Sequence, residues 1–309
     1  MKKKILITGG YGYIGAKLAL KLRKKYQVIL MEHPKAKKPN FLKGKFQIIK
    51  TDITNEKKIL KLKVQNIYAI LHLAAQSSGP KSFFIPREDI DKNIIGTLNI
   101  INFCSKNKIK RILFASSFVV YGKQEKNRFN EQMDLRPSSV YAMSKSYCEL
   151  LLKNYAQNKG IKWNILRMFN VYGNDQNIKN PDVGLVGIFM NLIREKNSIE
   201  VKGSLDRFRD LIHIDDVVEA WKLCLEKNKT NQIFNIASGK ATKFSTIINH
   251  LIKIIKPDQK VEVIQKGITY GDLKGSLANI KKTKKYLNFT AKTKLENGLL
   301  KMWQNENKK

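Results

Sequence analysis

The sequence contains no long apolar run. Among its 309 residues, none of the apolar stretches approaches the roughly 18 residues that a membrane-spanning helix requires. The basic start at Lys2–Lys4 is followed by only three apolar residues, Ile5–Ile7, before Thr8-Gly9-Gly10 interrupts them. This apolar segment is too short for an export signal. We therefore expect no membrane partner and no secretion.

Cysteine is also scarce. The three cysteines, Cys104, Cys148 and Cys224, are odd in number, far apart, and set in apolar helical patterns. This spacing matches neither a disulfide framework nor a metal site. We expect reduced thiols in the core of a cytoplasmic protein, and no bound metal.

Acidic residues are few, 25 against 59 basic ones, so the formal net charge is +34. Such a charge raises the possibility of a nucleic-acid-binding protein. Only nine of the basic residues are arginines, however, and the lysines are spread over every segment together with abundant Asn and Ile. No block combines arginine with interleaved aromatic residues, as base recognition would require. The pattern favours a compositional bias that still suits anionic substrates, and makes nucleic acid the less favoured partner.

A strand, a glycine loop, a helix and a second strand follow one another at the start of the chain. The strand 3–8 leads into Gly9, Gly12 and Gly15, and a helical pattern covers 16–25. Glycines at these positions permit a tight turn, close approach of backbone N–H groups to a pyrophosphate, and close packing of helix on strand. The arrangement predicts a dinucleotide-binding site.

Two acidic residues follow the next strands. Glu32 ends the strand 27–31, 17 residues after Gly15, where a carboxylate accepts hydrogen bonds from a ribose diol and repels a 2′-phosphate. This favours NAD over NADP. Asp52 follows the strand 46–50 and is expected to contact an adenine amino group, to cap the helix that begins near Asn55, or both.

Strands continue to alternate with helices up to residue 172. Strands are expected over 69–73, 111–115 and 163–169, and long helices over 90–107 and 137–159. The alternation predicts an α/β fold, a doubly wound parallel sheet of the Rossmann type, in which ligands bind beyond the carboxyl ends of the strands. Small residues at Ala74 and Ala75, after the fourth strand, would let a cofactor lie against the backbone.

The division into domains follows the same pattern. We assign 1–172 to an NAD-binding domain, expect 210–255 to return to it, and assign 173–309 mainly to a smaller, interleaved, substrate-binding lobe. In the returning segment, Asp215 or Asp216 is expected to cap a helix.

One stretch of the second long helix has the composition of an acid–base pair. Tyr141 and Lys145 are four residues apart and would stand one turn apart on one helix face. A neighbouring ammonium lowers the pKa of a phenol, which would let Tyr141 exchange a proton with a sugar or alcohol hydroxyl. In a lysine-rich chain the same pair also fits an ordinary amphipathic helix, so the remaining motifs must decide.

Three motifs in order, Gly9-x-x-Gly12-x-x-Gly15, Ser117 near a strand end, and Tyr141-x-x-x-Lys145, resemble the extended short-chain dehydrogenase/reductase family. Within this family they resemble the nucleotide-sugar epimerases and dehydratases, such as the UDP-galactose 4-epimerases. Further matching segments are Leu73-Ala74-Ala75, Asn93-x-x-Gly96-Thr97, Leu166-Arg167-x-Phe169-Asn170-Val171-Tyr172-Gly173 and Arg209-Asp210-x-Ile212-His213-x-x-Asp216.

The resemblance implies NAD as cofactor and a nucleotide-diphosphate sugar as substrate. Tyr141 would be the base, Lys145 would hold the nicotinamide ribose, and Ser117 would bind the reacting sugar oxygen. Asn170 and Arg209 would hold the substrate. Besides Tyr141 and Lys145, the residues expected to bind the cofactor are Gly9, Gly12, Tyr13, Ile14, Gly15, Glu32, Asp52, Ile53, Leu73, Ala74, Ala75 and Asn93.

Departures from the family pattern narrow the chemistry. The dehydratases and decarboxylases need an acidic residue just after the serine or threonine, where this chain has Phe118 and Val119. The fucose-forming enzymes need a cysteine and a histidine, where it has Phe118 and Asp175. Chemistry at sugar carbon 4 remains. Many relatives carry a diphosphate-binding arginine at the position of Thr269, for which Arg207 or Lys266 could substitute.

Three functional hypotheses follow. The first is an NAD-dependent nucleotide-sugar 4-epimerase, although Val119 replaces a threonine that is usual in these enzymes. The second is a 4-dehydrogenase or 4-ketoreductase on the same substrates, and the third is a nucleic-acid-binding protein that retains the fold. Because the helices over 90–107 and 137–159 carry apolar residues beyond one core-facing stripe, we also expect a homodimer.

Overall fold

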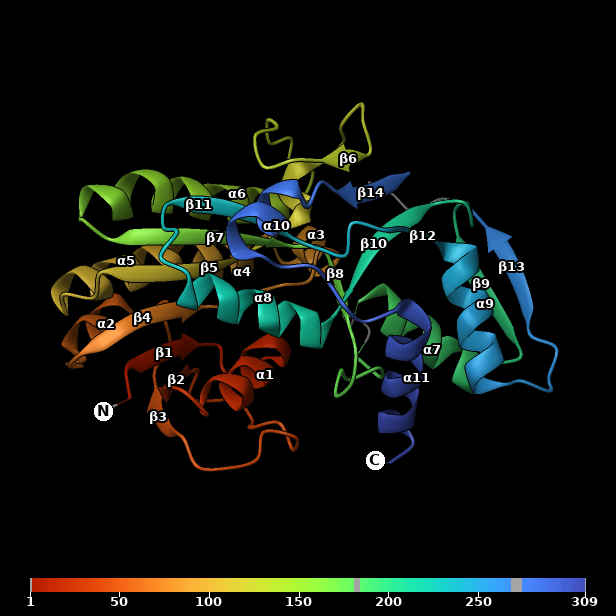
Figure 1. The fold of residues 1–309 in the computed structure, drawn as a ribbon, viewed down its shortest axis with the longest axis horizontal. Helices are drawn as coiled ribbons and strands as arrows, with labels where there is room; N and C mark the ends of the chain where they lie inside the picture. Colours follow the sequence, from red (N-terminus) through yellow and green to blue (C-terminus); the bar gives the residue numbers. More distant parts are fainter. Residues whose placement is uncertain (1, 181–183, 268–273, 309) are drawn as a thin grey trace. The chain divides into compact units, whose positions relative to one another are not determined.

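The computed structural model describes residues 2–180, 184–267 and 274–308 (Figure 1). The chain forms two compact units, the first made of 1–122, 134–167 and 218–234, the second of 123–133, 168–217 and 235–309. The later part of the chain therefore returns to the first unit over residues 218–234. The sequence suggested a longer returning segment, 210–255. No helix within the described ranges is long and apolar enough to cross a membrane.

The first unit is built on a seven-stranded sheet with the order β11-β7-β5-β4-β1-β2-β3. The strand pairs from β5 through β4, β1 and β2 to β3 run parallel, which confirms the doubly wound α/β sheet. The strands are β1 (Lys4–Thr8), β2 (Gln27–Glu32), β3 (Gln47–Lys50), β4 (Ile67–His72), β5 (Arg111–Ser117), β7 (Lys162–Met168) and β11 (Gln232–Ile236).

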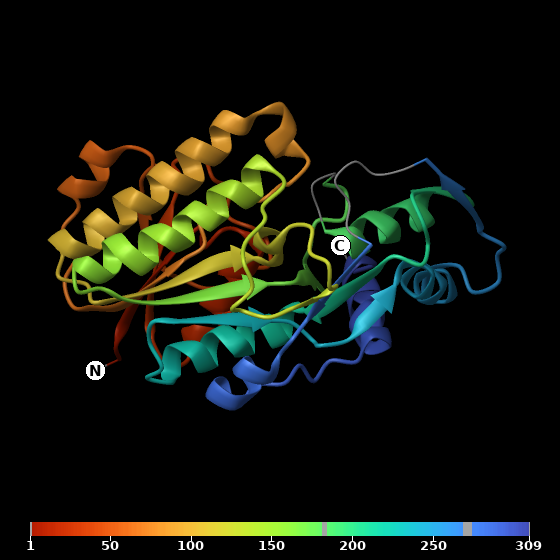
Figure 2. The ribbon, with the colours of Figure 1, turned by 90° about the horizontal axis from the view of Figure 1, so that it is seen from above.

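Helices cover both faces of this sheet (Figures 1 and 2). On one face lie α5 (Gly96–Lys106) and α6 (Val140–Leu150), and on the other α1 (Tyr13–Leu22) and α8 (Ile214–Glu226). Shorter elements are α2 (Glu56–Lys61), α3 (Lys81–Phe84), α4 (Pro86–Glu88) and the 3-10 turn η2 (Phe118–Tyr121). The face under α5 and α6 is filled by side chains at helical spacing, among them Ile100, Cys104, Cys148 and Leu152.

The two long helices expected from the sequence each contain a π-helical stretch. The first begins with η1 (Asp89–Ile95) before α5, and α6 continues into η3 (Leu151–Ala156). A π turn holds more residues than an α turn and so changes which side chains face the core. Apolar periodicity locates the helices but does not reveal these wider turns.

The second unit has a smaller sheet with the order β12-β10-β14-β6, to which β8 adds by pairing with β10, and a separate pair β13-β9. Its strands are β6 (Arg128–Phe129), β8 (Asn170–Tyr172), β9 (Ser198–Lys202), β10 (Phe208–His213), β12 (Ala241–Lys243), β13 (Glu262–Lys266) and β14 (Gly275–Ala278). Its helices are α7 (Leu185–Glu195), α9 (Phe244–Ile255), α10 (Lys281–Leu287) and α11 (Leu295–Glu306). Apolar faces of α7, α9 and α11 share one core, which includes Phe189, Ile193, Ile247 and Leu299.

The helix cap expected at Asp215 or Asp216 was a wrong prediction. Helix α8 begins at Ile214, directly after β10, so both aspartates lie inside its first turn. The Asp216 carboxylate instead accepts hydrogen bonds from the backbone N–H groups of Lys292 and Thr293, each at 3.0 Å. It therefore holds the segment that precedes α11.

Candidate active site

The glycine loop is packed against the end of β4. Gly9 has a φ of +67°, and a Cβ atom there would lie 2.8 Å from the backbone N and Cα atoms of Ala74. At Gly15 a Cβ atom would lie 2.3 Å from the carbonyl oxygen of Gly9. Any side chain at these positions would force the backbone apart, because these distances are shorter than real contacts. The loop therefore depends on glycine for its shape, as the sequence predicted.

The loop leads into α1 at Tyr13 without a side-chain cap, since the residue in the capping position is Gly12. The first N–H groups of a helix have no acceptor within the helix, and they carry the positive end of its dipole. Tyr13, Ile14 and Gly15 supply such groups at the carboxyl end of β1. This cradle fits the pyrophosphate of a dinucleotide.

Glu32 lies beside the same loop. The side chain is only 3% exposed, and its Oε1 accepts a hydrogen bond from the backbone N–H of Tyr11 at 3.0 Å. Burial raises the pKa of Glu32 to about 7, although hydrogen bonds from the N–H groups of Tyr11 and Gly10 oppose the increase. The carboxyl group is thus at the place where the sequence predicted a ribose partner, and that role stays a prediction.

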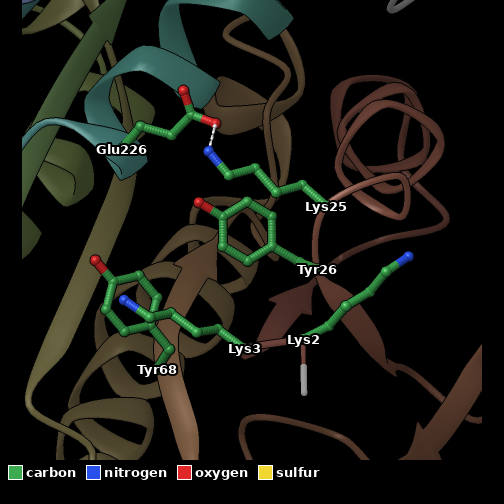
Figure 3. A pocket seen from close by; sticks show the side chains of 6 residues that line it. All are labelled: Lys2, Lys3, Lys25, Tyr26, Tyr68 and Glu226. Carbon is green, nitrogen blue, oxygen red and sulfur yellow. Dashed lines mark hydrogen bonds and ion pairs between the residues drawn. The ribbon is translucent and has the colours of Figure 1, made fainter.

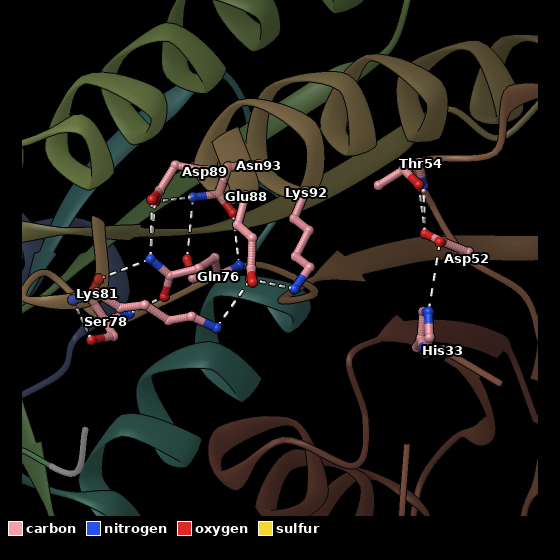
Figure 4. Close-up of polar contacts among 10 residues, drawn as sticks. All are labelled: His33, Asp52, Thr54, Gln76, Ser78, Lys81, Glu88, Asp89, Lys92 and Asn93. Atoms are coloured by element: carbon pink, nitrogen blue, oxygen red, sulfur yellow. Dashed lines mark hydrogen bonds and ion pairs between the residues drawn. The ribbon is translucent and has the colours of Figure 1, made fainter. Parts of the chain in front are cut away.

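Asp52 forms a turn rather than a helix cap. Its Oδ1 accepts from the backbone N–H and the hydroxyl of Thr54, both at 2.9 Å, and its Oδ2 lies 3.6 Å from Nε2 of His33 (Figure 4). Burial alone would raise the pKa of Asp52, but these contacts outweigh it and hold the pKa below its usual value. The residue that caps α2 is Asn55, which accepts from the N–H of Lys58 at 3.0 Å. Contact of Asp52 with an adenine stays a prediction.

The other predicted cofactor residues lie around the end of β4. The Thr8 hydroxyl accepts hydrogen bonds from the N–H groups of Leu73 at 3.2 Å and Ala74 at 3.1 Å, and Ala75 follows them, half-buried. Ile53 is 9% exposed and faces Gly96, where a Cβ atom would lie 2.6 Å from its Cδ1. The side chains of Ala74 and Ala75 themselves add only methyl groups to this stretch of backbone.

Asn93 is buried inside the protein. Its Oδ1 accepts from the N–H of Gln76 at 2.8 Å, and its Nδ2 donates to the Ser144 hydroxyl at 2.8 Å. These contacts join η1 to α6. The structure thus gives Asn93 a bracing position, and the predicted contact with the cofactor stays a prediction.

Tyr141, Lys145 and Ser117 come together at the carboxyl end of β5. Ser139 caps α6, its hydroxyl accepting from the N–H of Ala142 at 3.1 Å. This starts the helix so that Tyr141 and Lys145 point inward one turn apart, 9% and 3% exposed. Ser117, the last residue of β5, lies close enough to the Tyr141 hydroxyl to lower its pKa.

The electrostatics of this group differ from the expectation. Burial raises the pKa of Tyr141 to about 12, and the nearby Ser117 side chain only partly opposes this. The sequence predicted a lowered pKa, which is wrong for the protein without cofactor. The Lys145 ammonium donates to the carbonyl oxygen of Ala115 at 2.9 Å and lies 6.0 Å from the Tyr141 ring centroid. Burial also lowers the pKa of Lys145, to about 8.

Apart from Ser117, the residues predicted to bind substrate belong to the second unit. Arg207 and Arg209 both lie over the ring of Phe244, their guanidinium carbons 4.5 and 5.2 Å from its centroid. Burial and the charge of Arg207 lower the pKa of Arg209 to about 10. Asn170, on the adjacent strand β8, donates to the carbonyl of Asp210 at 3.2 Å. The structure thus gathers two guanidinium groups, a favourable arrangement for a diphosphate.

Comparison with known proteins now places the chain. Residues 5–237 match the NAD dependent epimerase/dehydratase family. The chain belongs to this family. It is an NAD-dependent enzyme, and the glycine cradle described above fits the phosphates of that cofactor.

Individual members of the family resemble the chain over most of its length. A putative UDP-glucose 4-epimerase of Methanocaldococcus jannaschii is 34% identical over 254 residues, which cover 82% of this chain and 81% of the relative. The crystal structure of the Thermotoga maritima UDP-glucose 4-epimerase with UDP-glucose has a TM-score of 0.90 and 29% identity, with 99% of each chain covered. The Bacillus cereus UDP-glucuronic acid 4-epimerase, in complex with UDP-glucuronic acid and NAD, has a TM-score of 0.87 and 26% identity, covering 99% of each chain.

One buried ion pair of this protein was not predicted from the sequence. Arg167 on β7 bonds through Nη2 to Oε2 of Glu149 on α6, at 2.6 Å, and the Ser116 hydroxyl donates to the other oxygen of Glu149 at 2.6 Å. The Arg167 guanidinium also lies 4.7 Å from the ring centroid of Tyr121. These contacts fix α6 against the ends of β5 and β7. The only signal was a charged residue within each of two otherwise apolar patterns.

The two proposed substitutes for a diphosphate-binding arginine have different surroundings. Lys266 forms an ion pair with Glu200, its Nζ 2.6 Å from Oε1. Arg207 instead donates through Nε to the carbonyl of Ser204 at 2.8 Å and remains beside Arg209. Thr269, the position that carries the arginine in many relatives, lies outside the described residues. Arg207 also donates through Nη2 to the carbonyl of Lys202, and a substrate role for either residue stays a prediction.

A basic recess of about 650 Å³ lies at the opposite edge of the large sheet, where β1, β2 and β4 begin (Figure 3). The Lys3 ammonium lies 4.3 Å from the ring centroid of Tyr68, and Lys25 pairs with Glu226 at 2.9 Å. Its lining is Lys2, Lys3, Lys25, Tyr26, Tyr68 and Glu226. The recess is separated from the glycine loop by the length of β1, so it is not the cofactor site.

Proposed function

We propose that the chain is an NAD-dependent nucleotide-sugar 4-epimerase. The observation that carries the proposal is that Ser117 and Tyr141 meet at the carboxyl end of β5, close enough for Ser117 to lower the pKa of the phenol, with Lys145 one helical turn away. A substrate hydroxyl that reaches these two oxygens meets one group that holds it and one that exchanges its proton. Ser117 and Tyr141 lie at the same edge of the sheet as the glycine cradle, beyond the carboxyl ends of the strands.

The substrate class follows from charge and from the relatives. The arginine pair over Phe244 suits the two phosphates of a nucleoside diphosphate, because guanidinium groups bind phosphate oxygens in pairs. The relatives named above act on or bind UDP-glucose and UDP-glucuronic acid. We therefore take a nucleotide-diphosphate sugar as the substrate.

The side chains of this protein would act on the sugar 4-hydroxyl. Ser117 orients its oxygen, Tyr141 accepts its proton, and Lys145 supplies positive charge near the phenolic oxygen as that proton arrives. Bound NAD supplies the acceptor and then the donor for the hydride of carbon 4. When the 4-keto sugar turns its other face, Tyr141 returns the proton, so that only the configuration at carbon 4 has changed.

The residues after Ser117 favour this outcome over elimination or decarboxylation. Phe118 and Val119 form the first turn of η2, and neither side chain can donate or accept a proton. A dehydratase or decarboxylase needs an additional acid or base near the reacting carbon. Chemistry confined to carbon 4 requires none beyond Tyr141.

The test is the substitution Tyr141→Phe, assayed for interconversion of UDP-glucose with UDP-galactose and of UDP-glucuronic with UDP-galacturonic acid. Loss of the phenolic hydroxyl should reduce turnover about 10²- to 10⁴-fold, while NAD binding and the circular dichroism spectrum stay as in the wild type. Tyr147→Phe is the matched control, because Tyr147 lies on the same helix but is 50% exposed. Full activity of Tyr141→Phe would refute the proposal.

Two other functions would give different results in the sugar assay or in a nucleic-acid binding assay. A 4-dehydrogenase or 4-ketoreductase on these substrates would accumulate NADH or a keto sugar, whereas an epimerase accumulates neither. A nucleic-acid-binding protein would show salt-sensitive binding of RNA or DNA without sugar turnover. The observation that keeps this second alternative is the lysine-lined recess at the far edge of the sheet.

We further propose a homodimer in the cytoplasm. Exposed apolar side chains on η1 and α6, Ile90, Met143, Tyr147 and Leu150, form a surface on the two helices that the sequence singled out. The cytoplasmic location is supported by the three cysteines, which are all buried and form no disulfide.

A further inference from the structure

A buried polar cluster (Figure 4) lies next to α6, the helix that carries Tyr141 and Lys145. Asp89, the first residue of η1, is 0% exposed, and Gln76, Asn93 and Ser144 are at most 7% exposed. None of them was assigned a catalytic part by the sequence. A fully buried carboxyl group is costly unless hydrogen bonds and charge support it, so its position requires an explanation.

Backbone contacts determine how the two amides of the cluster are oriented. The N–H of Ser78 donates to Oε1 of Gln76, and Nε2 of Gln76 donates to the carbonyl of Ser78 at 2.8 Å. Oδ1 of Asn93 likewise accepts from the N–H of Gln76. The NH₂ groups of Gln76 and Asn93 must therefore face Asp89, to which they donate at 3.1 to 3.2 Å. Burial raises the pKa of Asp89, and the hydrogen bonds that it accepts, together with the charge of Lys145, oppose this increase.

The same cluster is linked to Tyr141 by a chain of hydrogen bonds. Asn93 donates to the Ser144 hydroxyl, which donates in turn to the backbone carbonyl of Tyr141 at 2.8 Å. One turn further along, the Cys148 thiol donates to the carbonyl of Asn93 at 3.1 Å. Residues 141, 144 and 148 lie on one face of α6. The turn that carries Tyr141 is thus held through Asn93.

The charge of Asp89 acts on both members of the catalytic pair. It raises the pKa of Lys145 against the opposing effect of burial, as Cys148 and Glu149 also do. It adds to the effect of burial on the pKa of Tyr141. On the other side, Asp89 faces Glu88 and Lys81 at the ends of α4 and α3.

We propose that Asp89 is a positioning residue of the catalytic pair: its buried carboxylate keeps the Lys145 ammonium charged and, through Asn93 and Ser144, holds the turn of α6 that presents Tyr141. This inference rests on the proposed function of Tyr141 and Lys145. Lys145 is far from solvent and has no carboxylate in its own hydrogen bond, which goes to a backbone carbonyl. The buried acidic groups nearby, Cys148, Asp89 and Glu149, therefore help it to keep its proton.

The kinetic test is Asp89→Asn, with Asp91→Asn as the matched control. Asp91 lies on the same turn of η1 but pairs with Arg87 at the surface. Asp89→Asn removes the negative charge, so the Lys145 proton is lost at lower pH. We expect the basic limb of the pH profile of kcat to move down by about 0.5 to 1 on the pH scale, and Asp91→Asn to leave it in place. A uniform fall in kcat with unmoved limbs would mean a merely structural role and overturn the proposal.

A measurement that needs no turnover separates this proposal from the proposed function. This measurement is a double-mutant cycle of Asp89→Asn and Lys145→Met, in which urea unfolding gives the free energy of unfolding of each variant. About one and a half pH units below 8, where Lys145 is charged, the effects of the two substitutions on this free energy should be coupled. About one and a half pH units above 8, where Lys145 is neutral, the two effects should be additive. Coupling together with an active Tyr141→Phe variant would reject the epimerase but keep the Asp89–Lys145 interaction. Absence of coupling at the lower pH rejects the present proposal alone.

If Asp89→Asn does not fold, Asp89→Ser takes its place, because it also removes the negative charge. The basic limb should then move in the same direction as expected for Asp89→Asn, and Ser144→Ala, which leaves the charge intact, should lower kcat without moving the limb. An unmoved limb in Asp89→Ser would overturn the proposal.

Discussion

Glu32 has a folded-state pKa of about 7, above its ordinary value of 4.5, because its side chain is buried. The folded protein therefore keeps a proton that the unfolded chain has already lost. The stability linked to this proton is complete below about pH 4.5 and is lost as the pH rises through 7. Its full size is at most about 3 kcal/mol, from the difference between the two pKa values.

Glu32→Gln should remove this pH dependence. We expect the midpoint of thermal unfolding of the cofactor-free wild type to fall between pH 5 and 7.5, and that of the variant to fall less, because an amide does not ionise. Scanning calorimetry at several pH values measures the difference. Glu262→Gln, at an exposed site on β13, serves as control and should follow the wild type. Parallel curves for Glu32→Gln and wild type would contradict the assignment.

The same carboxyl group should govern cofactor choice. Only the ionised form accepts hydrogen bonds from both hydroxyls of a ribose diol and repels a 2′-phosphate. We expect NAD affinity, measured by calorimetric titration, to increase as the pH rises through 7, and the preference for NAD over NADP to shrink in Glu32→Gln. An unchanged preference in that variant would assign cofactor choice to other residues.

At the scale of elements, the start of α6 determines where Tyr141 stands. Ser139→Ala removes the hydroxyl that accepts from the N–H of Ala142 and should lower the free energy of unfolding by about 1 kcal/mol. Turnover should fall as well, because the first turn of the helix frays. Ser146→Ala is the control, since that hydroxyl only donates to a carbonyl of its own helix, that of Ala142, at 2.9 Å. Urea unfolding and kcat should be nearly unchanged in the control.

The elements also show what the sequence can and cannot reveal. Strands such as β1, β2 and β5 were located within two residues because buried parallel strands are continuous apolar runs. β10 escaped because its centre is Asp210, a fully buried carboxyl group. This group accepts from the N–H groups of Ser238, Gly239 and Ala278. Its partners are 28 to 68 residues away, and no local pattern can indicate such a pairing.

The candidate site divides in the same way. Gly9, Ser117, Tyr141 and Lys145 could be predicted because each is part of a short motif with its own spacing. The part proposed for Asp89 could not, because it depends on the amide orientations of Gln76 and Asn93, which only the folded backbone determines. The pKa of Tyr141 was also out of reach, since burial, which a sequence does not quantify, exceeds the effect of a neighbouring charge.

At the scale of the whole molecule, the remaining question is what covers the apolar surface on η1 and α6. Met143, Tyr147 and Leu150 are 50 to 52% exposed, and Ile90 is 43% exposed. Their spacing along α6 puts them on the face opposite to Tyr141 and Ser144. A second copy of the chain presents the same helices, and two such faces related by a two-fold axis would bury each other.

Charges placed on this face should separate the subunits. Light scattering of the wild type at micromolar concentration should give twice the chain mass of 35.6 kDa, and the double substitution Met143→Lys and Leu150→Lys should give the single mass with an unchanged circular dichroism spectrum. Leu300→Lys on α11, where Leu300 is 43% exposed, is the control and should stay dimeric. Because Tyr141 and Lys145 lie on the inner face of the same helix, the monomer should also turn over more slowly. A monomeric wild type would leave this surface without the partner proposed for it.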